Sequence, residues 1–158
     1  MGSFIYPPNR ATSVKGTVTN DSAASGDVGE IITSNVTSYQ NVAASATVFD
    51  ITSLSLTAGD WDVSGNCIYQ ANSATFTSTD LILAISTTSG ASFGSIDVSN
   101  TIELAGVVPT TFSIIYINSQ TVRFSLAATT TVYLKGYVGA FSAGTPRYQG
   151  AFRARRMR

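Results

Sequence analysis

The sequence predicts an all-β fold, an antiparallel β-sandwich or jelly roll of about eight or nine short strands. Three observations lead to this prediction. Apolar and polar residues alternate with period two in one segment after another, turn residues such as Gly, Asn, Asp and Pro separate these segments at regular spacing, and the 3.6-residue period of an amphipathic helix is absent. Because the chain has 158 residues, the strands are expected to form a single domain.

The clearest alternation lies in Ser53–Tyr69, SLSLTAGDWDVSGNCIY. Leu56 precedes a turn at Ala58–Asp60, and Trp61 and Cys67 follow it; Gly accepts positive φ in such a turn, and Asp hydrogen-bonds its own backbone. We therefore predict a β-hairpin with one buried face. Trp61 is expected in the core or in an interface, and the single cysteine, Cys67, is expected to be a small buried hydrophobe.

The other strands follow from the same alternation. In chain order they are predicted at residues 30–36, 42–51, 81–85, 102–104, 112–117, 121–126, 132–138 and 148–155, with a further short strand inside an exposed loop at 86–100. The block Leu81–Ile85 is apolar throughout and is expected to be buried on both faces or nearly so. In the strand 132–138, aliphatic residues face one side and Tyr133 and Tyr137 face the other, so both faces have something to bury.

The composition predicts an oligomer. Charged residues are 11% of the chain while apolar residues are 44%, and serine and threonine make up roughly a quarter. A single domain of this kind has little charged surface, so copies of the chain are expected to cover part of one another. The formal net charge is zero, yet five of the nine cations lie in the last twelve residues: Arg147, Arg153, Arg155, Arg156 and Arg158.

Residues 1–14 are expected to form an extended N-terminal arm, ahead of a β-sandwich domain at 15–158. The arm carries three apolar residues followed by two prolines: Phe4, Ile5, Tyr6, Pro7 and Pro8. Consecutive prolines favour an extended backbone that does not join a sheet. The alternative is that the aromatic residues fold back over one edge of the domain. No apolar run is long enough to span a bilayer and no secretion signal begins the chain, so membrane insertion is not expected.

The sequence favours no catalytic site, metal site or cofactor. The chain has no histidine, which excludes ordinary Ser or Cys triads and most zinc sites. Asp60 and Asp62 flank Trp61, an arrangement that a glycoside hydrolase or a calcium site could use. Because both aspartates lie beside a glycine turn and no EF-hand spacing occurs, a turn-and-surface role is the stronger interpretation. The chain is therefore not expected to be an enzyme.

The arginine-rich C-terminus has two interpretations. A basic cluster is typical of phosphate contacts with nucleic acid. The segment also alternates like a strand with one packed side, and the rest of the chain has an excess of acids. We therefore favour ion pairs between subunits, and we expect no nucleic-acid binding.

Three stretches together resemble a small β-sandwich domain at the C-terminal end of tailed-bacteriophage tail fibres and related virion proteins. They are KGTVTNDSAASGDVGEIITSNV (Lys15–Val36), TSLSLTAGDWDVSGN (Thr52–Asn66) and TTVYLKGYVGAFSAGTPRYQGAFRARRMR (Thr130–Arg158). The string LTAGDWDVSG and the terminal RARRMR are the most specific parts. The resemblance implies a non-enzymatic, trimeric virion module on the exterior of a tailed-phage particle, made in the host cytoplasm and involved in attachment to the host surface.

Within such a module, the sequence features described above suggest roles for several groups of residues. The arm residues Phe4 to Pro8 are expected to anchor the chain to another virion protein. The loop at 86–100 is expected to face a receptor, which is a host-surface polysaccharide or protein, through Ser89, Ser92, Phe93 and Asp97. Contacts between subunits of the homotrimer are expected from Tyr133, Tyr137, Arg153 and Arg155.

A second function is kept beside the first. The tail-fibre domain usually follows a long shaft, whereas the resemblance here begins at about residue 15 and leaves only the arm before it. The alternative is therefore a capsid, collar or tail-tube decoration or connector protein that is anchored by its arm.

Overall fold

The computed structural model describes residues 23–72, 77–93, 101–105, 113–142 and 144–158, and this part of the chain is all-β. It contains no helix, so no helix in it is long and apolar enough to cross a membrane. The strands are β1 (Ile31–Asn41), β2 (Thr47–Leu56), β3 (Gly59–Ala71), β4 (Thr77–Ser78), β5 (Asp80–Ser86), β6 (Thr101–Ala105), β7 (Ile114–Asn118), β8 (Val122–Leu126), β9 (Thr130–Val138), β10 (Phe141–Ser142) and β11 (Pro146–Arg156).

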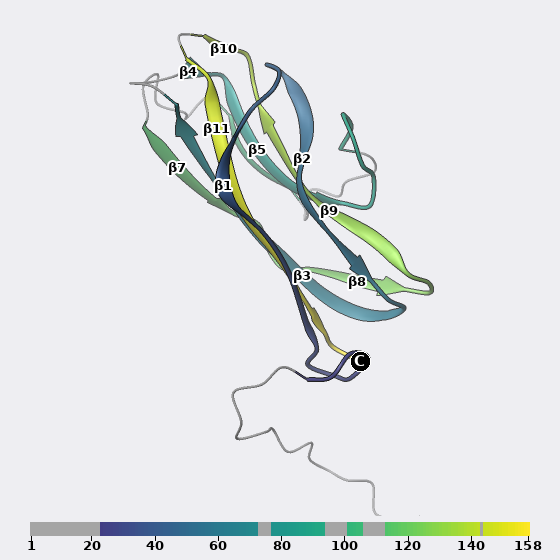
Figure 1. The fold of residues 1–158 in the computed structure, drawn as a ribbon. Coiled ribbons are helices and arrows are strands. Elements are labelled where there is room, and N and C mark those ends of the chain that lie inside the picture. The colour runs from purple at the N-terminus through teal and green to yellow at the C-terminus, as the bar shows by residue number, and fades with distance from the viewer. Residues whose placement is uncertain (1–22, 73–76, 94–100, 106–112, 143) are drawn as a thin grey trace, which may run out of the picture.

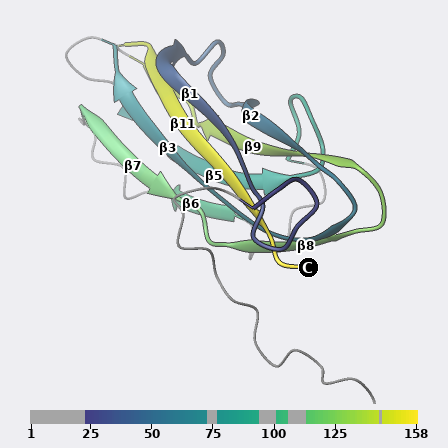
Figure 2. The ribbon, with the colours of Figure 1, turned by 60° about the horizontal axis from the view of Figure 1, so that its bottom comes forward.

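Nine of these strands form two sheets that pack face to face (Figures 1 and 2). The five-stranded sheet has the order β1-β11-β3-β7, with β8 also paired to β3. The four-stranded sheet has the order β2-β9-β5-β6, and β4 and β10 form a separate pair. The predicted antiparallel sandwich is confirmed, and its strand number agrees with the eight or nine expected.

The pairing is nested, which makes the sandwich a jelly roll. β5 pairs with β6, β3 with β7 and β8, β2 with β9, and β1 with β11, so each pair encloses the one before it along the chain. Every pair is antiparallel. The rolled-up ribbon closes into two sheets through the contacts of β11 with β3 and of β9 with β5.

The hairpin predicted at residues 53–69 is wrong. β2 and β3 lie in different sheets, and the turn at Ala58 and Gly59 (φ +137°) carries the chain from one layer to the other. The predicted buried face is correct, since Leu56, Trp61 and Cys67 are fully buried. Alternation tells which side of a strand faces the core, but a chain that crosses between two layers has the same alternation as one that turns back within a layer.

Two smaller differences concern strand limits. The strand expected at 42–51 begins only at Thr47, because residues 44–46 bend and turn, with Ala46 in the left-handed region (φ 51°). The loop expected at 86–100 contains no strand in its described residues 87–93, and residues 94–100 lie outside the described part of the chain. The arm residues Phe4, Ile5, Tyr6, Pro7 and Pro8 and the boundary at residue 14 lie outside it as well.

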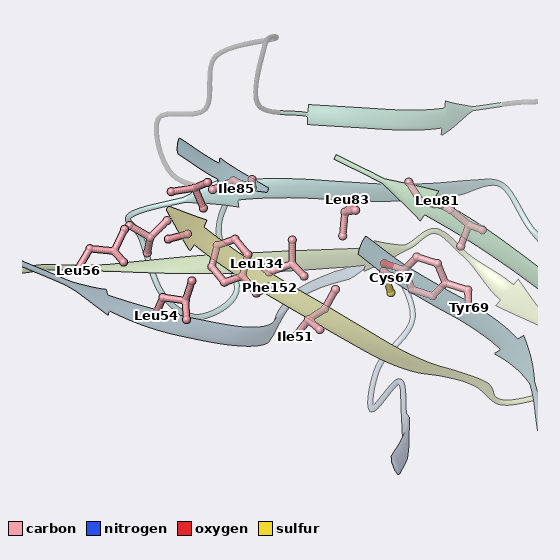
Figure 3. Close-up of a cluster of buried hydrophobic side chains, with 14 of the residues drawn as sticks. Ile51, Leu54, Leu56, Cys67, Tyr69, Leu81, Leu83, Ile85, Leu134 and Phe152 are labelled. Atoms are coloured by element: carbon pink, nitrogen blue, oxygen red, sulfur yellow. The ribbon is translucent and has the colours of Figure 1, made fainter. Parts of the chain in front are cut away.

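The core fills the space between the sheets (Figure 3). Its largest fully buried apolar side chains include Trp61, Tyr69 and Phe152 from one sheet and Leu134 from the other. The Tyr69 hydroxyl donates a hydrogen bond to the backbone oxygen of Ile82 at 3.1 Å, which satisfies its polar atom and joins the two layers.

Cys67 is buried as predicted, and burial raises the pKa of its thiol to about 12. A thiol that stays protonated at neutral pH is a poor nucleophile, which agrees with a packing role.

Two glycines let side chains of the four-stranded sheet approach the backbone of the five-stranded sheet. A Cβ atom on Gly65 would lie 2.6 Å from Leu134 Cδ1, and one on Gly150 would lie 2.5 Å from Ile51 Cγ2. Real Cβ atoms do not approach carbon so closely. Gly65 in β3 and Gly150 in β11 therefore set the close spacing at the middle of the sandwich.

Replacing Trp61 by Ala is expected to lower the free energy of unfolding by about 3 to 5 kcal/mol, because it empties a fully buried site. Urea unfolding followed by circular dichroism measures this change. Tyr116→Ala is the matched control: this residue is 65% exposed, and the expected change is within about 0.5 kcal/mol. Equal stabilities for the Trp61 variant and the unmodified chain would contradict a core role for this indole.

Candidate functional site

Asp60, one of the two aspartates of the acidic pair, is fixed by arginines. Its Oδ2 accepts a hydrogen bond from Arg123 Nη2 at 3.0 Å and another from Arg158 Nε. A hydrogen bond from Ser125, followed by those from Arg158 and Arg123, lowers the pKa of Asp60 from its ordinary 3.8 to about 2. A general acid of a glycoside hydrolase must hold a proton near neutral pH, and Asp60 does not. Its role is that of an anchor that is ionised at neutral pH.

Arg156 is the centre of a second polar cluster, at the end of the sandwich where β1 begins and β11 ends. Its guanidinium lies 4.3 Å from the ring of Trp61, and Nε donates to Glu30 Oε2 at 3.0 Å. Further hydrogen bonds go to the Ala58 backbone oxygen at 2.9 Å and to the hydroxyl of Thr57. Arg156 thus fastens the last strand to the first strand and to the turn between β2 and β3.

Two further donors, the backbone N–H of Gly26 and the side chain of Ser25, hold the carboxylate of Glu30. The backbone N–H of Gly26 donates to Oε2 at 2.8 Å, and this bond, together with those from Arg156 and Ser25, keeps the pKa of Glu30 below its usual value despite its burial. The sequence interpretation expected the terminal arginines to pair between subunits. Arg156 and Arg158 instead pair with Glu30 and Asp60 of their own chain.

The other side of the sandwich carries a buried lysine that holds a loop. Lys135 in β9 points away from the core and is fully buried, because residues 87–93 fold over it. Its Nζ donates to a carboxylate oxygen of Asp50 and, at 3.0 Å each, to the backbone oxygens of Thr88 and Gly90. Asp50 Oδ2 in turn accepts the Gly90 N–H at 2.9 Å. All three ammonium protons therefore have acceptors, and the loop is fixed to the sheet.

This loop is the described part of the predicted receptor-facing loop. Ser89 and Ser92 are exposed, whereas Phe93 is half-buried with its ring centroid 6.2 Å from that of Tyr137. Asp97 lies outside the described residues. The predicted receptor contacts of these residues stay a prediction.

The predicted subunit contacts lie on opposite sides of the sandwich. Tyr133 and Tyr137 are half-buried beside Lys135 and the loop, with Lys135 Nζ 5.6 Å from the Tyr133 ring centroid. Arg153 and Arg155 lie on the other side, on the surface of the five-stranded sheet, and both are exposed. The tyrosines therefore have partners in their own chain, and the arginines are the members of the group that remain open to a second molecule.

We call the side of the five-stranded sheet that faces away from the core its outer face. The register places residues in rows across the strands. One row is Asn35, Ala151, Asn66 and Asn118, and neighbouring rows hold Arg153 beside Ser64 and Tyr116 beside Ile68. Three carboxamides thus stand on one line across β1, β3 and β7, with the small Ala151 between two of them.

The outer face is hollowed at this row. A hollow of about 470 Å³, here the first hollow, has polar side chains of Thr33, Asn35, Ser64, Asn66, Asn118 and Arg153 in its lining. A second hollow of about 320 Å³ adjoins it, shares Asn35, Asn66 and Ala151, and extends toward Ile68 and Gln149. Both lie within the size range of small-ligand sites.

A break between β7 and β8 forms one wall of the first hollow. The two strands pair with successive parts of β3, and residues 119–121 leave the ladder between them. Ser119 maintains the connection, since its N–H donates to the Gly65 oxygen and its hydroxyl accepts from the Gly65 N–H, both at 2.8 Å. Ser119 and Thr121 line the hollow as a result.

The outer face is also the cationic side of a neutral chain. The register puts four arginines and two aspartates on it: Arg123, Arg147, Arg153, Arg155, Asp60 and Asp62. Asp60 is neutralised by its arginine partners, whereas Arg153 and Arg155 form no ion pair with any described residue.

Sequence reasoning assigned no function to the row of amides. Asn66 falls on the polar side of a predicted strand, but Asn118 lies just beyond the strand predicted at 112–117, and the two are 52 positions apart in the sequence. Only the strand order and register bring them side by side. Within the described residues, no three His, Cys, Asp or Glu side chains gather as a metal site.

No protein-family model and no curated protein sequence matches the chain. Among solved structures, a chain in the structure of infectious bursal disease virus, Gx strain, is similar with a TM-score of 0.50 and 10% sequence identity, over 81% of this chain and 32% of that one. A chain of the infectious bursal disease virus VP2 subviral particle aligns with a TM-score of 0.40 and 10% identity, over 82% and 38%. The present chain spans about a third of their length. At this identity, the first similarity shows a shared fold.

Acid is expected to weaken the fold partly through Asp60. Because its folded-state pKa is depressed to about 2, its contribution to stability is complete above about pH 4 and is lost as the pH falls toward 2. Asp60→Asn should therefore lower the urea midpoint at pH 6 and lose less stability than the unmodified chain between pH 4 and pH 2. Asp62→Asn is the control, because it removes a charge from the same strand and Asp62 makes no ion pair with a described residue. Parallel acid profiles for the Asp60 variant and the unmodified chain would contradict the anchor role.

Proposed function

We propose that the chain is a structural virion protein: a fibre-like, non-enzymatic trimeric module on the exterior of a tailed-phage particle that takes part in attachment to the host surface. The observation that carries this proposal is the open outer face of the five-stranded sheet, which is polar and hollowed. The corresponding surface of the other sheet is covered at Lys135 by the chain's own loop. A module that only linked two proteins would not need a hollowed polar face.

Two further observations support a virion role. The jelly-roll pairing agrees with the fold that the resemblance to tail-fibre domains implies, and that resemblance covers three stretches between residues 15 and 158. A chain of a virus structure shares the fold at a TM-score of 0.50. The low charge content favours an oligomer, and the resemblance implies that this oligomer is a trimer.

A decoration or connector role is the second candidate, and one observation favours it. Three large apolar side chains are exposed at the end of the sandwich where β1 begins and β11 ends: Val28 (63%), Ile31 (37%) and Met157 (44%). Exposed apolar groups of this kind suit a contact with another protein. Together with the arm residues Phe4, Ile5, Tyr6, Pro7 and Pro8, they would attach the module to a virion partner.

Purified particles are expected to carry the protein on their surface, where gold-labelled antibody against the domain should bind intact particles in electron micrographs. The isolated chain should be a trimer by light scattering at micromolar concentration. Particles without label, or a stable monomer in solution, would contradict the corresponding part of the proposal.

A chain lacking residues 1–10 tests whether the arm or the β-domain attaches the protein to the particle. If the arm anchors the module, the truncated chain should keep its melting temperature and oligomeric state but be missing from particles. Normal incorporation of the truncated chain would show that the attachment surface lies on the β-domain.

A further inference from the structure

The amides in the row on the outer face have no hydrogen-bond partner among the described residues. The side chains of Asn35, Asn66 and Asn118 make no hydrogen bond to any described residue, although each has a carbonyl acceptor and two N–H donors. Adjacent strands are about 4.8 Å apart, so three strand intervals spread the row over about 14 Å. A ligand that matches it must present several hydrogen-bonding groups along an extended line.

The hollow is too polar for the centre of a stable protein interface. Contacts that hold subunits together have a core that is richer in apolar area than the rest of the surface. Here the side chains at the centre are Asn66, Ser64 and Ala151, and the largest exposed apolar residues at the chain end, Val28 and Met157, do not line either hollow. Many hydroxyl groups on a narrow chain fit this surface better than an apolar protein patch does.

Arg153 adds a charge requirement. It lies on the row next to the amides, lines the first hollow, is exposed, and pairs with no acid of the described chain. A guanidinium binds carboxylate through two parallel hydrogen bonds. The site therefore selects a ligand that carries negative charge as well as hydroxyls.

Tyr116 provides an apolar boundary on the other side of the amide row. The residue is 65% exposed and is paired across the strands with Ile68, which lines the second hollow. An exposed tyrosine offers a flat apolar face together with a polar tip. This combination suits the less polar face of a sugar ring.

We propose that the outer face of the five-stranded sheet binds a polysaccharide whose sugar units carry carboxylates. Arg153 pairs with a carboxylate, the amides of Asn35, Asn66 and Asn118 bind hydroxyls, and Tyr116 packs on a ring. This inference rests on the proposed host-attachment function and names its ligand class and its surface. Single-stranded nucleic acid is the less suitable polyanion, because it binds by stacking successive bases on several aromatic side chains, whereas Tyr116 is the one exposed aromatic residue among the described residues of this face.

Hexagalacturonate, which has one carboxylate per sugar, is a suitable probe, and its methyl-esterified form is the neutral control. Calorimetric titration of the full chain at low ionic strength should show saturable binding of the acid and weaker binding of the ester. Arg153→Gln should weaken binding by about tenfold or more, because a charge-assisted hydrogen bond is lost. Tyr116→Ala should weaken it too.

Arg155→Gln is the matched control. This arginine is exposed on the same strand and the same face, but it lies in the row of Asp62, one row farther from the amides than Arg153, so its loss should weaken binding by less than about threefold. Melting temperatures of all variants should match that of the unmodified chain, since each replaced side chain is exposed.

Four results would overturn the inference: no saturable binding, equal losses for the two arginine variants, an oligonucleotide that binds as tightly with the same dependence on Arg153, or a change of oligomeric state in Arg153→Gln, which would make the face a subunit contact. If the antibody labels intact particles but the protein binds no hexagalacturonate, this inference alone is overturned. Binding by a protein that is absent from particles would overturn the proposed function alone.

Discussion

The structure depends on the insertion of the last strand between the first and the third. β11 pairs with β1 along one edge and with β3 along the other, so without it the five-stranded sheet would separate into β1 and a group around β3. Arg156 fixes the end of this strand through the Trp61 ring and Glu30. Removing one partner of a buried ion pair leaves an uncompensated buried charge, so the loss of either Glu30 or Arg156 would destabilise this end of the strand.

The same strand gives the sheet two unlike sides. Toward the core it presents Phe152 and Ala154 and, at Gly150, no side chain, so the four-stranded sheet approaches closely. Away from the core it presents Ala151 and Arg153, and these provide the small floor and the charge of the first hollow. A single alternating segment thus both builds the sandwich and shapes its exposed face.

The two outer surfaces of the sandwich differ in how they meet solvent. On the four-stranded sheet, Lys135 and Asp50 hold a loop against the strands, and the ammonium and the carboxylate find their partners within the chain. On the five-stranded sheet, the amides and Arg153 have no such partners among the described residues. Polar groups that the chain leaves unpaired are the ones available to a ligand, and this contrast is the basis for placing attachment on the five-stranded sheet.

The sequence predicted what alternation can encode. The fold class and the burial of Trp61 and Cys67 follow from which side of a strand each residue occupies, and the structure confirms them. The burial of the block Leu81–Ile85, also confirmed, follows from its being apolar throughout. Alternation does not encode strand partners. It therefore gave a hairpin where the chain crosses between sheets.

For the same reason, alternation did not reveal the amide row, which exists only because β1, β11, β3 and β7 are neighbours. The burial of Lys135 was also unforeseen. A loop covers it from above, and no pattern within strand 132–138 records that loop.

The central claim is that ligand contact occurs on the outer face of the five-stranded sheet and not on the loop of the opposite side. Mapping of backbone amide NMR shifts during titration with hexagalacturonate tests it directly. The largest shifts should occur at Asn66, Asn118 and Ala151, with residues 87–93 unchanged. Shifts confined to residues 87–93 would contradict the claim and return the receptor contact to the loop.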